Sequence, residues 1–370
     1  MNPQTVFCPN QACPSRGLIG AGNIGIKSQK ERRYTCKSCG KSFAETTGTP
    51  LFSLKKADQL FFWVVTLLGH GCPPQAIVAA FGLDIRTVLA WQAKAGGHCQ
   101  RVHQALVEEQ PRDLGQVQAD EIRVKMYKRL IVWMAMAIQV PTRLWLGGEI
   151  SPQRDKRLIQ RLADKVKSCA LFAAILLVTD GLASYVSAWR RSFRTPVWTG
   201  KKGRPLLLAW PQVVIGQVVK RYQSKHVVGV EQRLVQGTKE QQDALLPPGQ
   251  QLNSAYIERL NATFRACLFA LVRRSRALAH QVLTLQAGMY LIGTVYNFCT
   301  PHKSLRQEQA EGTRKWLQRT PAMAAGITDH CWSMAELMTY RIPPPAYVPP
   351  KRRGRKPKSA SQPILAGGPA

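Results

Sequence analysis

The chain of 370 residues carries a large excess of positive charge. Its 52 lysines and arginines stand against 21 aspartates and glutamates, which gives a formal net charge of +31 and a pI near 10.3. Hydrophobic residues make up 45% of the sequence, enough to bury the cores of two or three domains. Because so much positive charge repels itself in a compact chain, we expect nucleic acid as the partner, with an acidic membrane surface as the rival and a small neutral substrate disfavoured.

The membrane alternative finds little support in the sequence. No run of about 18 consecutive apolar residues occurs, so no transmembrane helix is predicted. The first residues also lack the charged start and the apolar run of a secretion signal. We therefore expect a cytoplasmic protein without a membrane partner, in a reducing compartment where close cysteine pairs hold metal more often than they form disulfides.

Four of the ten cysteines lie in the first 40 residues and form two close pairs, Cys8 with Cys13 and Cys36 with Cys39. Gly40 follows the second pair and can adopt the left-handed turn that lets backbone amides face the sulfurs. The 22 residues between the pairs are enough for a hairpin and a return strand. The pattern predicts a zinc ribbon over residues 1–50, with four thiolates around one Zn²⁺. The alternative is four unrelated buried cysteines.

Residues 51–110 are predicted to form a helical DNA-binding domain. An apolar-faced helix is followed by a second helix that begins at Pro74, Gly82 makes a turn, and Asp84 caps a third helix. The apolar residues around the turn have helix-turn-helix spacing, and a plain helical hairpin is the alternative. The exposed face of the third helix would offer four side chains to DNA: Arg86, Thr87, Gln92 and Lys94.

From residue 114 the pattern becomes that of an α/β fold. Strands are predicted over 117–124, 130–140 and 144–150, a helix over 155–168, and a strand buried on both faces over 173–180. Three strands, a helix and a central strand predict a mixed α/β sheet of the ribonuclease-H type. We place this catalytic domain at 114–305, with helices resuming from residue 253.

Basic segments interrupt and follow that domain. Residues 190–240 hold 11 lysines and arginines against two acids, and we predict a basic insertion over about 190–250 that covers or grips nucleic acid, with Lys201, Lys202 and Arg204 as contacts. A C-terminal helical segment is expected over 306–342 and a disordered, basic, proline-rich tail over 343–370. In the tail, Arg353 and Arg355 are candidate DNA contacts, through a minor-groove hook or, as we favour, through phosphates.

Because carboxylates are scarce, their positions are informative. Asp120 lies in the first predicted strand, Asp180 ends the fourth, and Glu258 lies on the helix that starts near residue 253. A ribonuclease-H sheet places the first strand beside the fourth, and the later helix crosses that point. Such carboxylates can hold two Mg²⁺ ions about 4 Å apart, with Mn²⁺ as an alternative, for phosphodiester chemistry. Glu121 is an alternative ligand, but strand alternation turns it to the opposite face, and we favour Asp120.

The helix that carries Glu258 has two stripes. One is apolar and buried, and the other consists of Glu258, Asn261 and Arg265. An acid, an amide and a cation on one semi-exposed face suit metal and phosphate binding. An ordinary amphipathic helix with a polar flank is the alternative.

The sequence resembles the DDE transposases of bacterial insertion sequences, within the ribonuclease-H-like integrase superfamily, and looks closest to the branch similar to insertion sequence one. The resemblance extends from the zinc ribbon to about residue 340. It is carried by the following segments: CKSCGKSF at 36–43, TTGTPL at 46–51, ADEI at 119–122, VTDG at 178–181, 253–265, 296–305 and 319–329. In such a family the protein would act on the bacterial nucleoid.

The resemblance implies a catalytic triad of Asp120, Asp180 and Glu258, with Arg265 as the basic residue seven places after the glutamate. It also implies two magnesium ions, cleavage of double-stranded DNA at transposon ends, joining of the freed 3′-hydroxyl to target DNA, and a homo-oligomer in the synaptic complex. His302 lies in a matching segment, either near the scissile phosphate or in a packing role.

Two features depart from the family pattern. The 77 residues between Asp180 and Glu258 exceed the spacing of short-spaced members, and Thr300 stands where many relatives carry arginine. Two other functions stay open. One is a ribonuclease-H-like nuclease that cuts DNA without joining it. The other is a domesticated DNA-binding regulator without catalysis, against which the intact set of acids argues.

Overall fold

A computed structural model of the chain describes residues 1–54, 59–200, 203–224, 226–272, 278–309 and 315–349. The chain divides into two compact units, residues 1–47 together with the segment from 343 onward, and residues 48–342. The helices predicted for 51–110 and the strands predicted from 114 thus fall in one unit and share one hydrophobic core. Within the described residues, no helix is long and apolar enough to cross a membrane.

The first unit contains a small antiparallel sheet. Its strands are β1 (Ile24–Ser28), β2 (Arg33–Cys36) and β3 (Ser42–Ala44), in the order β1-β2-β3, after a short 3₁₀ helix (Pro3–Thr5). Val6, Ile24 and Tyr34 pack with three of the cysteines into a core of its own. The expected hairpin, β1 with β2, lies between the cysteine pairs, whereas the third strand, β3, follows the second pair instead of preceding it.

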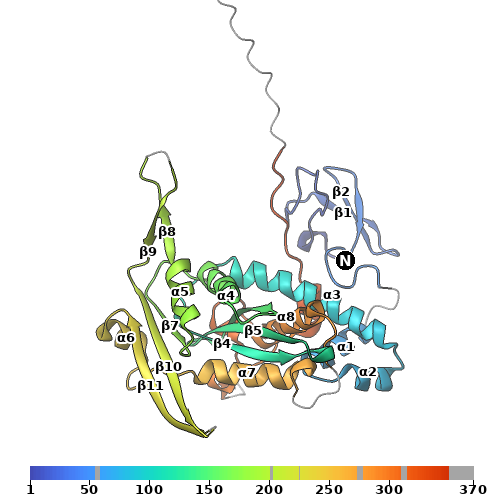
Figure 1. The fold of residues 1–370 in the computed structure, drawn as a ribbon. Helices are drawn as coiled ribbons and strands as arrows, with labels where there is room; N and C mark the ends of the chain where they lie inside the picture. The colour runs from blue at the N-terminus through green and yellow to red at the C-terminus, as the bar shows by residue number, and fades with distance from the viewer. Residues whose placement is uncertain (55–58, 201–202, 225, 273–277, 310–314, 350–370) are drawn as a thin grey trace, which may run out of the picture. The chain divides into compact units, whose positions relative to one another are not determined.

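The second unit is built on a mixed sheet of six strands in the order β11-β10-β7-β4-β5-β6 (Figure 1). The strands are β4 (Gly115–Lys125), β5 (Ile131–Gln139), β6 (Trp145–Ser151), β7 (Ile175–Thr179), β10 (Val213–Gln223) and β11 (His226–Gln236). The first three are antiparallel neighbours, whereas β7 runs parallel to β4 and β10 parallel to β7. The predicted pairing of the first strand with the fourth is confirmed, and every residue of β7 is buried, as its apolar run predicts.

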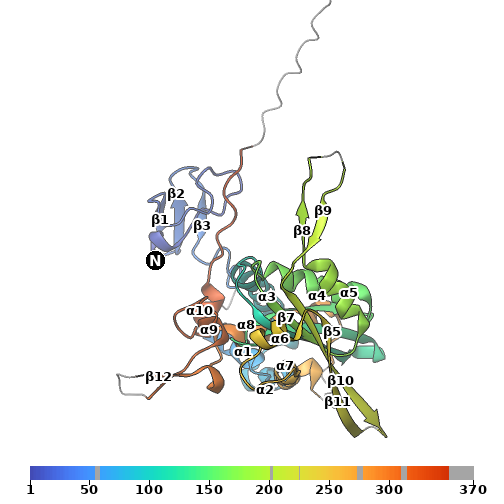
Figure 2. The same ribbon diagram turned by 90° about the vertical axis from the view of Figure 1, so that its left-hand side faces the viewer.

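The predicted insertion over 190–250 is in part wrong. Strand β10 is an integral strand of the main sheet: it pairs in parallel with β7, and every residue from Val213 to Val218 is buried. Its uncharged run VVIGQVV at 213–219 stands between basic segments, and the sequence interpretation included it with them. A separate hairpin of β8 (Arg194–Val197) and β9 (Leu206–Ala209) projects from the body (Figure 2), and α6 (Lys239–Leu245) follows β11.

Helices cover both faces of the main sheet. On one side lie α4 (Lys156–Ser168) and α5 (Ala183–Ser192), and on the other α7 (Ala255–Cys267) and α8 (Val282–Phe298). Strand alternation produces this division: Glu121 contacts Tyr185 of α5, whereas the neighbouring Asp120 contacts Asn261 of α7. Residues 306–342 hold two short strands, β12 (Gln307–Glu308) and β13 (Trp316–Leu317), and the helices α9 (Pro321–Ala324) and α10 (Met334–Thr339).

The N-terminal helices of this unit are α1 (Gln59–Gly69), α2 (Pro74–Phe81) and α3 (Ile85–His103). Three predicted details are present: Pro74 opens α2, Gly82 adopts a φ of +61°, and the Asp84 carboxylate accepts the Arg86 amide at 2.7 Å. The 19-residue α3 then continues against α8, so closely that a Cβ on Gly96 would lie 2.2 Å from the Ala287 carbonyl oxygen.

One predicted DNA contact on α3 is wrong. Gln92 was expected on the exposed face, but it is 2% exposed because α3 runs on across α8, where a Cβ on Gly288 would lie 3.0 Å from the Gln92 amide nitrogen. Because the C-terminal part of α3 packs in the hydrophobic core, part of its polar stripe is buried.

Candidate active site and metal centres

The two cysteine pairs of the first unit converge on one point. The sulfurs of Cys8 and Cys39, and those of Cys13 and Cys36, are 3.7 Å apart, and all four lie within 4.8 Å of one another. Four thiolates at a Zn–S distance of about 2.3 Å have sulfur–sulfur separations of about 3.8 Å in a regular tetrahedron. The cluster could therefore bind a metal ion without rearrangement.

The turn at the second pair has the backbone that the sequence predicts. Gly40 adopts a φ of +70°, and its N–H donates to the Cys36 carbonyl at 2.8 Å.

Burial raises the pKa of Cys39, but hydrogen bonds from the Asn10 side chain and the Lys41 amide outweigh it and lower the pKa to about 6. Burial raises the pKa of Cys8, so this thiol needs a bound cation to ionise.

In the second unit the three predicted catalytic acids line one pocket of about 400 Å³. Asp120 comes from β4, Asp180 directly follows β7, and Glu258 lies in the first turn of α7. Arg154, which precedes α4, and Lys220 of β10 line the same pocket. Five different elements thus deliver charged side chains to one place.

Three acids stand closest together: ligand oxygens of Asp120, Glu121 and Asp180 lie within 4.8 Å of one another. Burial raises the pKa of Asp120 to about 6, and the negative charges of Glu121, Asp180 and Glu258 act in the same direction. The Asn261 amide nitrogen donates to the Asp120 carboxylate at 2.8 Å and fixes its orientation. The crowding of like charges is what a divalent cation would relieve.

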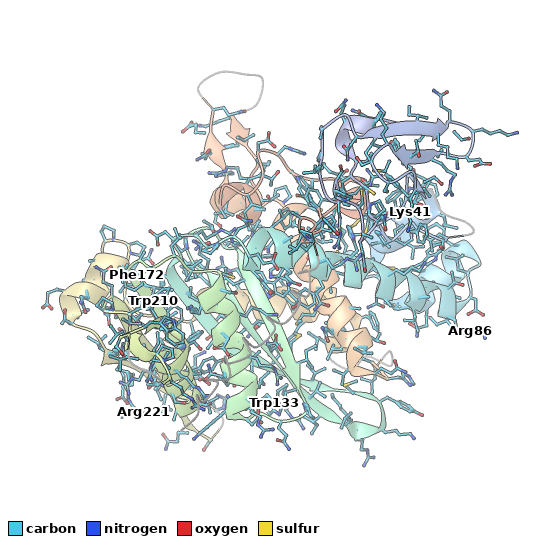
Figure 3. All side chains as sticks on the ribbon, turned by 90° about the horizontal axis from the view of Figure 1, so that it is seen from above. Lys41, Arg86, Trp133, Phe172, Trp210 and Arg221 are labelled. Atoms are coloured by element: carbon cyan, nitrogen blue, oxygen red, sulfur yellow. The ribbon has the colours of Figure 1, made fainter. Side chains whose placement is uncertain are left out.

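Glu121 is turned away from the pocket, as strand alternation predicts. Its side chain is fully buried and accepts hydrogen bonds from Arg154 Nε at 2.8 Å and from the Tyr185 hydroxyl at 3.2 Å. Arg154 also reaches Asp180 at 3.3 Å and lies over the ring of Trp133, which is labelled in Figure 3. Glu121 therefore anchors Arg154, and Arg154 in turn orients Asp180.

Glu258 lies at the rim of the pocket, outside the closest group of acids. Lys220 Nζ pairs with its carboxylate at 2.5 Å, and the Ser254 hydroxyl donates to the same oxygen at 2.6 Å. Burial raises the pKa of Glu258, but these two partners outweigh it and the pKa is lowered. To coordinate a metal together with Asp120 and Asp180, Glu258 would exchange Lys220 for the ion.

Two glutamines that the sequence interpretation missed position this site. The side-chain oxygen Oε1 of Gln118 accepts the N–H groups of Tyr256 and Ile257 at 3.0 Å each, and so caps α7. The Gln217 amide donates to the Asp180 carbonyl at 3.1 Å. Gln118 stands two residues before Asp120 on the same face of β4, and this spacing is the one signal that the sequence offered.

The predicted DNA contacts lie in several places. Arg86 is exposed at the start of α3 (Figure 3) and pairs with Asp84 at 3.1 Å. Thr87 is half-buried, and Lys94 donates to the Phe52 carbonyl at 3.2 Å. Arg204 is exposed in the β8–β9 hairpin. Lys201, Lys202, Arg353 and Arg355 lie outside the described residues.

One of these predicted contacts is corrected by the structure. Asn261 is 1% exposed and holds Asp120, because α7 packs against β4 at this residue, whereas Glu258 of the same stripe is exposed. Arg265, one turn further, is half-buried near the end of α7. His302 stands edge-on to the Tyr296 ring at 4.6 Å between centroids, the arrangement of the packing alternative.

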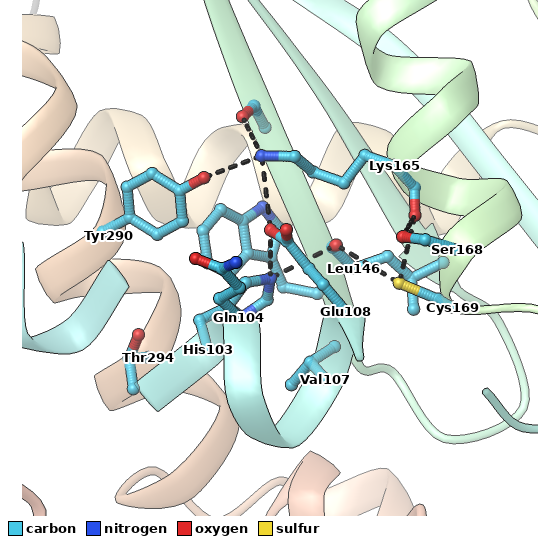
Figure 4. A network of polar contacts seen from close by, with 12 residues as sticks. His103, Gln104, Val107, Glu108, Leu146, Lys165, Ser168, Cys169, Tyr290 and Thr294 are labelled. Carbon is cyan, nitrogen blue, oxygen red and sulfur yellow. Dashed lines mark hydrogen bonds and ion pairs between the residues drawn. The ribbon is translucent and has the colours of Figure 1, made fainter. Parts of the chain in front are cut away.

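A second cluster of charges lies between α4, β6 and α8 (Figure 4). Lys165 pairs with Glu108 at 3.2 Å and with Glu149 at 3.0 Å, and it donates to the Tyr290 hydroxyl at 2.7 Å. His103 is fully buried beside Glu108, and burial lowers its pKa to about 3, so it is neutral. The sequence pattern gave no sign of this cluster.

The sequence was compared with protein-family models and with curated proteins. No protein-family model matches the sequence, and no curated protein matches it significantly. Functional inference therefore depends on the motifs and on the geometry of the acidic pocket.

Proposed function

We propose that the protein is a DNA transposase that cleaves phosphodiester bonds at transposon ends and transfers the freed strands to target DNA, with metal ions held by Asp120, Asp180 and Glu258. The single observation that carries the proposal is the pocket in which these three carboxylates meet, from two paired strands and a crossing helix. The strong positive charge of the chain supports DNA as the substrate.

The arrangement of the sheet supports a ribonuclease-H-like catalytic domain. Three antiparallel strands are followed by a helix and by β7, which lies parallel to β4. This is the order in which such a domain brings its first two acids together. The N-terminal helices, with a turn at Gly82 and an exposed Arg86, are proposed as a helix-turn-helix that recognises the transposon ends.

The side chains of the pocket fit hard divalent cations. Carboxylate oxygens are the ligands that Mg²⁺ and Mn²⁺ prefer, and bound Mg²⁺ would activate a water or a DNA 3′-hydroxyl and stabilise the leaving oxygen. Asn261 keeps one Asp120 oxygen fixed and leaves the other for an ion. Asp180 accepts Arg154 on one oxygen and the Leu182 amide on the other, so it is held in place and an ion would use the further lone pairs of these oxygens. Lys220 stands where it can contact a phosphate once Glu258 binds metal.

The four cysteines fit Zn²⁺ rather than Mg²⁺, because thiolates are soft ligands. We assign them a structural zinc ribbon that contributes to DNA binding, in a protein that acts as a homo-oligomer on the bacterial nucleoid. Metal analysis of the purified protein should give one zinc per chain, and a Cys36→Ser variant should lose it. Retention of zinc by that variant would contradict the assignment.

Supercoiled donor DNA with Mg²⁺ tests the catalytic proposal. Asp180→Ala should abolish nicking at transposon ends, whereas Asp243→Ala, which removes an exposed acid on α6, should nick like the wild type. Circular dichroism of both variants checks folding. Nicking by Asp180→Ala at the wild-type rate would show that the site is wrongly assigned. Nicks without joined products would indicate a nuclease, and DNA binding without any Mg²⁺-dependent cleavage would indicate a regulator.

A further inference from the structure

A second pocket, of about 660 Å³, lies between α4 and α5. Its lining residues are cationic or neutral and polar except for Ala188, and the aliphatic parts of their side chains form most of its surface. We call it the basic groove. Among the described residues, no carboxylate lines the groove. Four of its lining residues are positively charged, and two are neutral and polar: Lys156, Arg157, Arg161 and Arg191, with Gln160 and Ser187 beside them. None of these residues took part in the functional interpretation of the sequence.

Helical spacing aligns the groups that line the basic groove. On α4, Arg157 and Arg161 are one turn apart, and on α5 Ser187 and Arg191 have the same spacing. The two helices are tied together at this point, because Gln160 donates to the Ser192 hydroxyl at 2.7 Å and Ser192 donates to Asp164 at 2.7 Å. The cations therefore stand on a fixed framework.

The charges of the groove lack internal compensation. Arg161 pairs with Glu149 at 3.1 Å, but in the described parts of the chain no carboxylate lies within ion-pair distance of Lys156, Arg157 or Arg191. Lys156 and Arg157 stand in the first turn of α4, which contains no acid. Cations at this end of a helix oppose its dipole by about 0.3–1 kcal/mol each. An external anion would relieve both effects.

The groove belongs to the same local structure as the acidic pocket. Arg154, which orients Asp180, directly precedes the N-cap of α4, and Asp180 is followed after two residues by α5. The chain has no acid between Asp180 and Glu231, so α5 brings no negative charge to the groove. On α4 the two nearest acids are engaged in local hydrogen bonds: Asp155 caps the helix, and Asp164 accepts from Gln160 and Ser192. A polyanion that enters the acidic pocket therefore has a basic surface next to it along both helices.

We propose that the basic groove binds the phosphate backbone of double-stranded DNA and holds the duplex next to the acidic pocket. The inference rests on the proposed function, because that function supplies duplex DNA as the substrate. It adds a positioning surface to a site in which the carboxylates alone would repel the DNA. Arg157 of α4 and Arg191 of α5 both line the groove, one from each helix, and are its central contacts.

The test is the salt dependence of binding to a fluorescent duplex, followed by anisotropy. The double variant Arg157→Gln/Arg191→Gln should bind about tenfold or more weakly, and the slope of log K against log salt should fall by about 2, as expected for two lost phosphate contacts. A control, Lys303→Gln/Lys315→Gln, removes the same charge from two exposed sites in the C-terminal segment and should stay within about twofold of wild type.

Cleavage kinetics separate the groove from the catalytic site. The groove variant should keep its kcat at saturating DNA and raise its KM, because the carboxylates are untouched. If wild type binds and cleaves DNA while the groove variant matches the control, the groove inference is wrong and the proposed function stands. If wild type neither binds nor cleaves DNA, both fail. Loss of binding to vesicles of an anionic phospholipid, with duplex binding unchanged, would identify a lipid surface and overturn the inference.

Discussion

The acidic pocket and the Lys165 cluster are both groups of acids and bases in the same unit, yet they balance their charges differently. Among the described side chains, the Lys165 cluster sets two carboxylates, Glu108 and Glu149, against the cations Lys165 and Arg161. The acidic pocket, together with the buried Glu121 behind it, sets four carboxylates against two cations, Arg154 and Lys220. The first is neutral, and the second has an excess of two negative charges.

This difference has a physical consequence. In a neutral cluster each buried charge satisfies another, so the cluster contributes to the specificity and stability of the fold. An excess of negative charge destabilises the protein, and it can persist where a ligand with positive charge compensates it. Burial raises the pKa of Asp120 to about 6, and the like charges around it act in the same direction. The comparison therefore separates a cluster whose charges are balanced from one whose negative charge is in excess.

The largest effect is expected from removing the cation of the balanced cluster. Lys165→Met should lower the free energy of unfolding by about 3–5 kcal/mol, because Glu108 and Glu149 lose their shared partner in a partly buried site. Urea denaturation measures it. Lys167→Met, two residues along α4, is the control and should stay within about 0.5 kcal/mol of wild type. A loss for Lys165→Met no larger than the control would contradict the idea that this cluster stabilises the fold.

The corresponding change in the acidic pocket should leave stability intact. Asp180→Asn keeps the oxygen that accepts the Leu182 amide at 3.0 Å and removes one unit of the negative excess, so the metal-free variant should be at least as stable as wild type. Wild type should gain about 1.4 kcal/mol in about 10 mM Mg²⁺ for a Kd of about 1 mM, and the variant should gain much less. Thermal unfolding with and without Mg²⁺ measures both. Equal Mg²⁺ stabilisation in the two proteins would remove Asp180 from the metal site.

The pH dependence of metal binding sharpens the same contrast. Asp120, with a pKa of about 6, must lose its proton to coordinate Mg²⁺, so affinity should fall about tenfold between pH 7 and pH 5. In the metal-free protein the stability changes with pH in the opposite direction. Because folding raises the pKa of Asp120, the contribution of this residue to stability is lost as pH rises from about 4 through 6. Calorimetric Mg²⁺ titrations at pH 5, 6 and 7 provide the measurement, with Asp120→Asn as the control. An affinity that stays flat over this range would disprove the role of Asp120.

The sequence predicted the parts of the site that depend on local pattern. A continuous apolar run ending in an acid identified β7 and Asp180, and alternation assigned Asp120 and Glu121 to opposite faces. The cysteine spacing predicted the thiolate cluster with its Gly40 turn. In each case neighbours along the chain determine the geometry, so a single stretch of residues holds the information.

What the sequence could not predict depends on contacts between distant segments. Arg154 is one of 52 basic residues, and nothing in its neighbourhood indicates that it joins Glu121 to Asp180. Lys220 was assigned to an insertion because β10 stands between basic segments, and its pairing with β7 joins residues that are distant in the sequence. Asn261 was taken as exposed because helical spacing defines a stripe but not the surface that it faces. Tertiary packing decides each of these.

The smallest predicted effect concerns such a long-range contact. Gln118→Ala should lower stability by about 1 kcal/mol, because the N–H groups of Tyr256 and Ile257 lose their acceptor at the start of α7. The loosened first turn carries Glu258 and Ser254, so the variant should also bind Mg²⁺ more weakly while the Lys165 cluster is unaffected. Hydrogen exchange of the first turn of α7 detects the change. Unchanged protection there, with weaker Mg²⁺ binding, would mean that Gln118 acts on Asp120 through β4 and not on Glu258 through the helix.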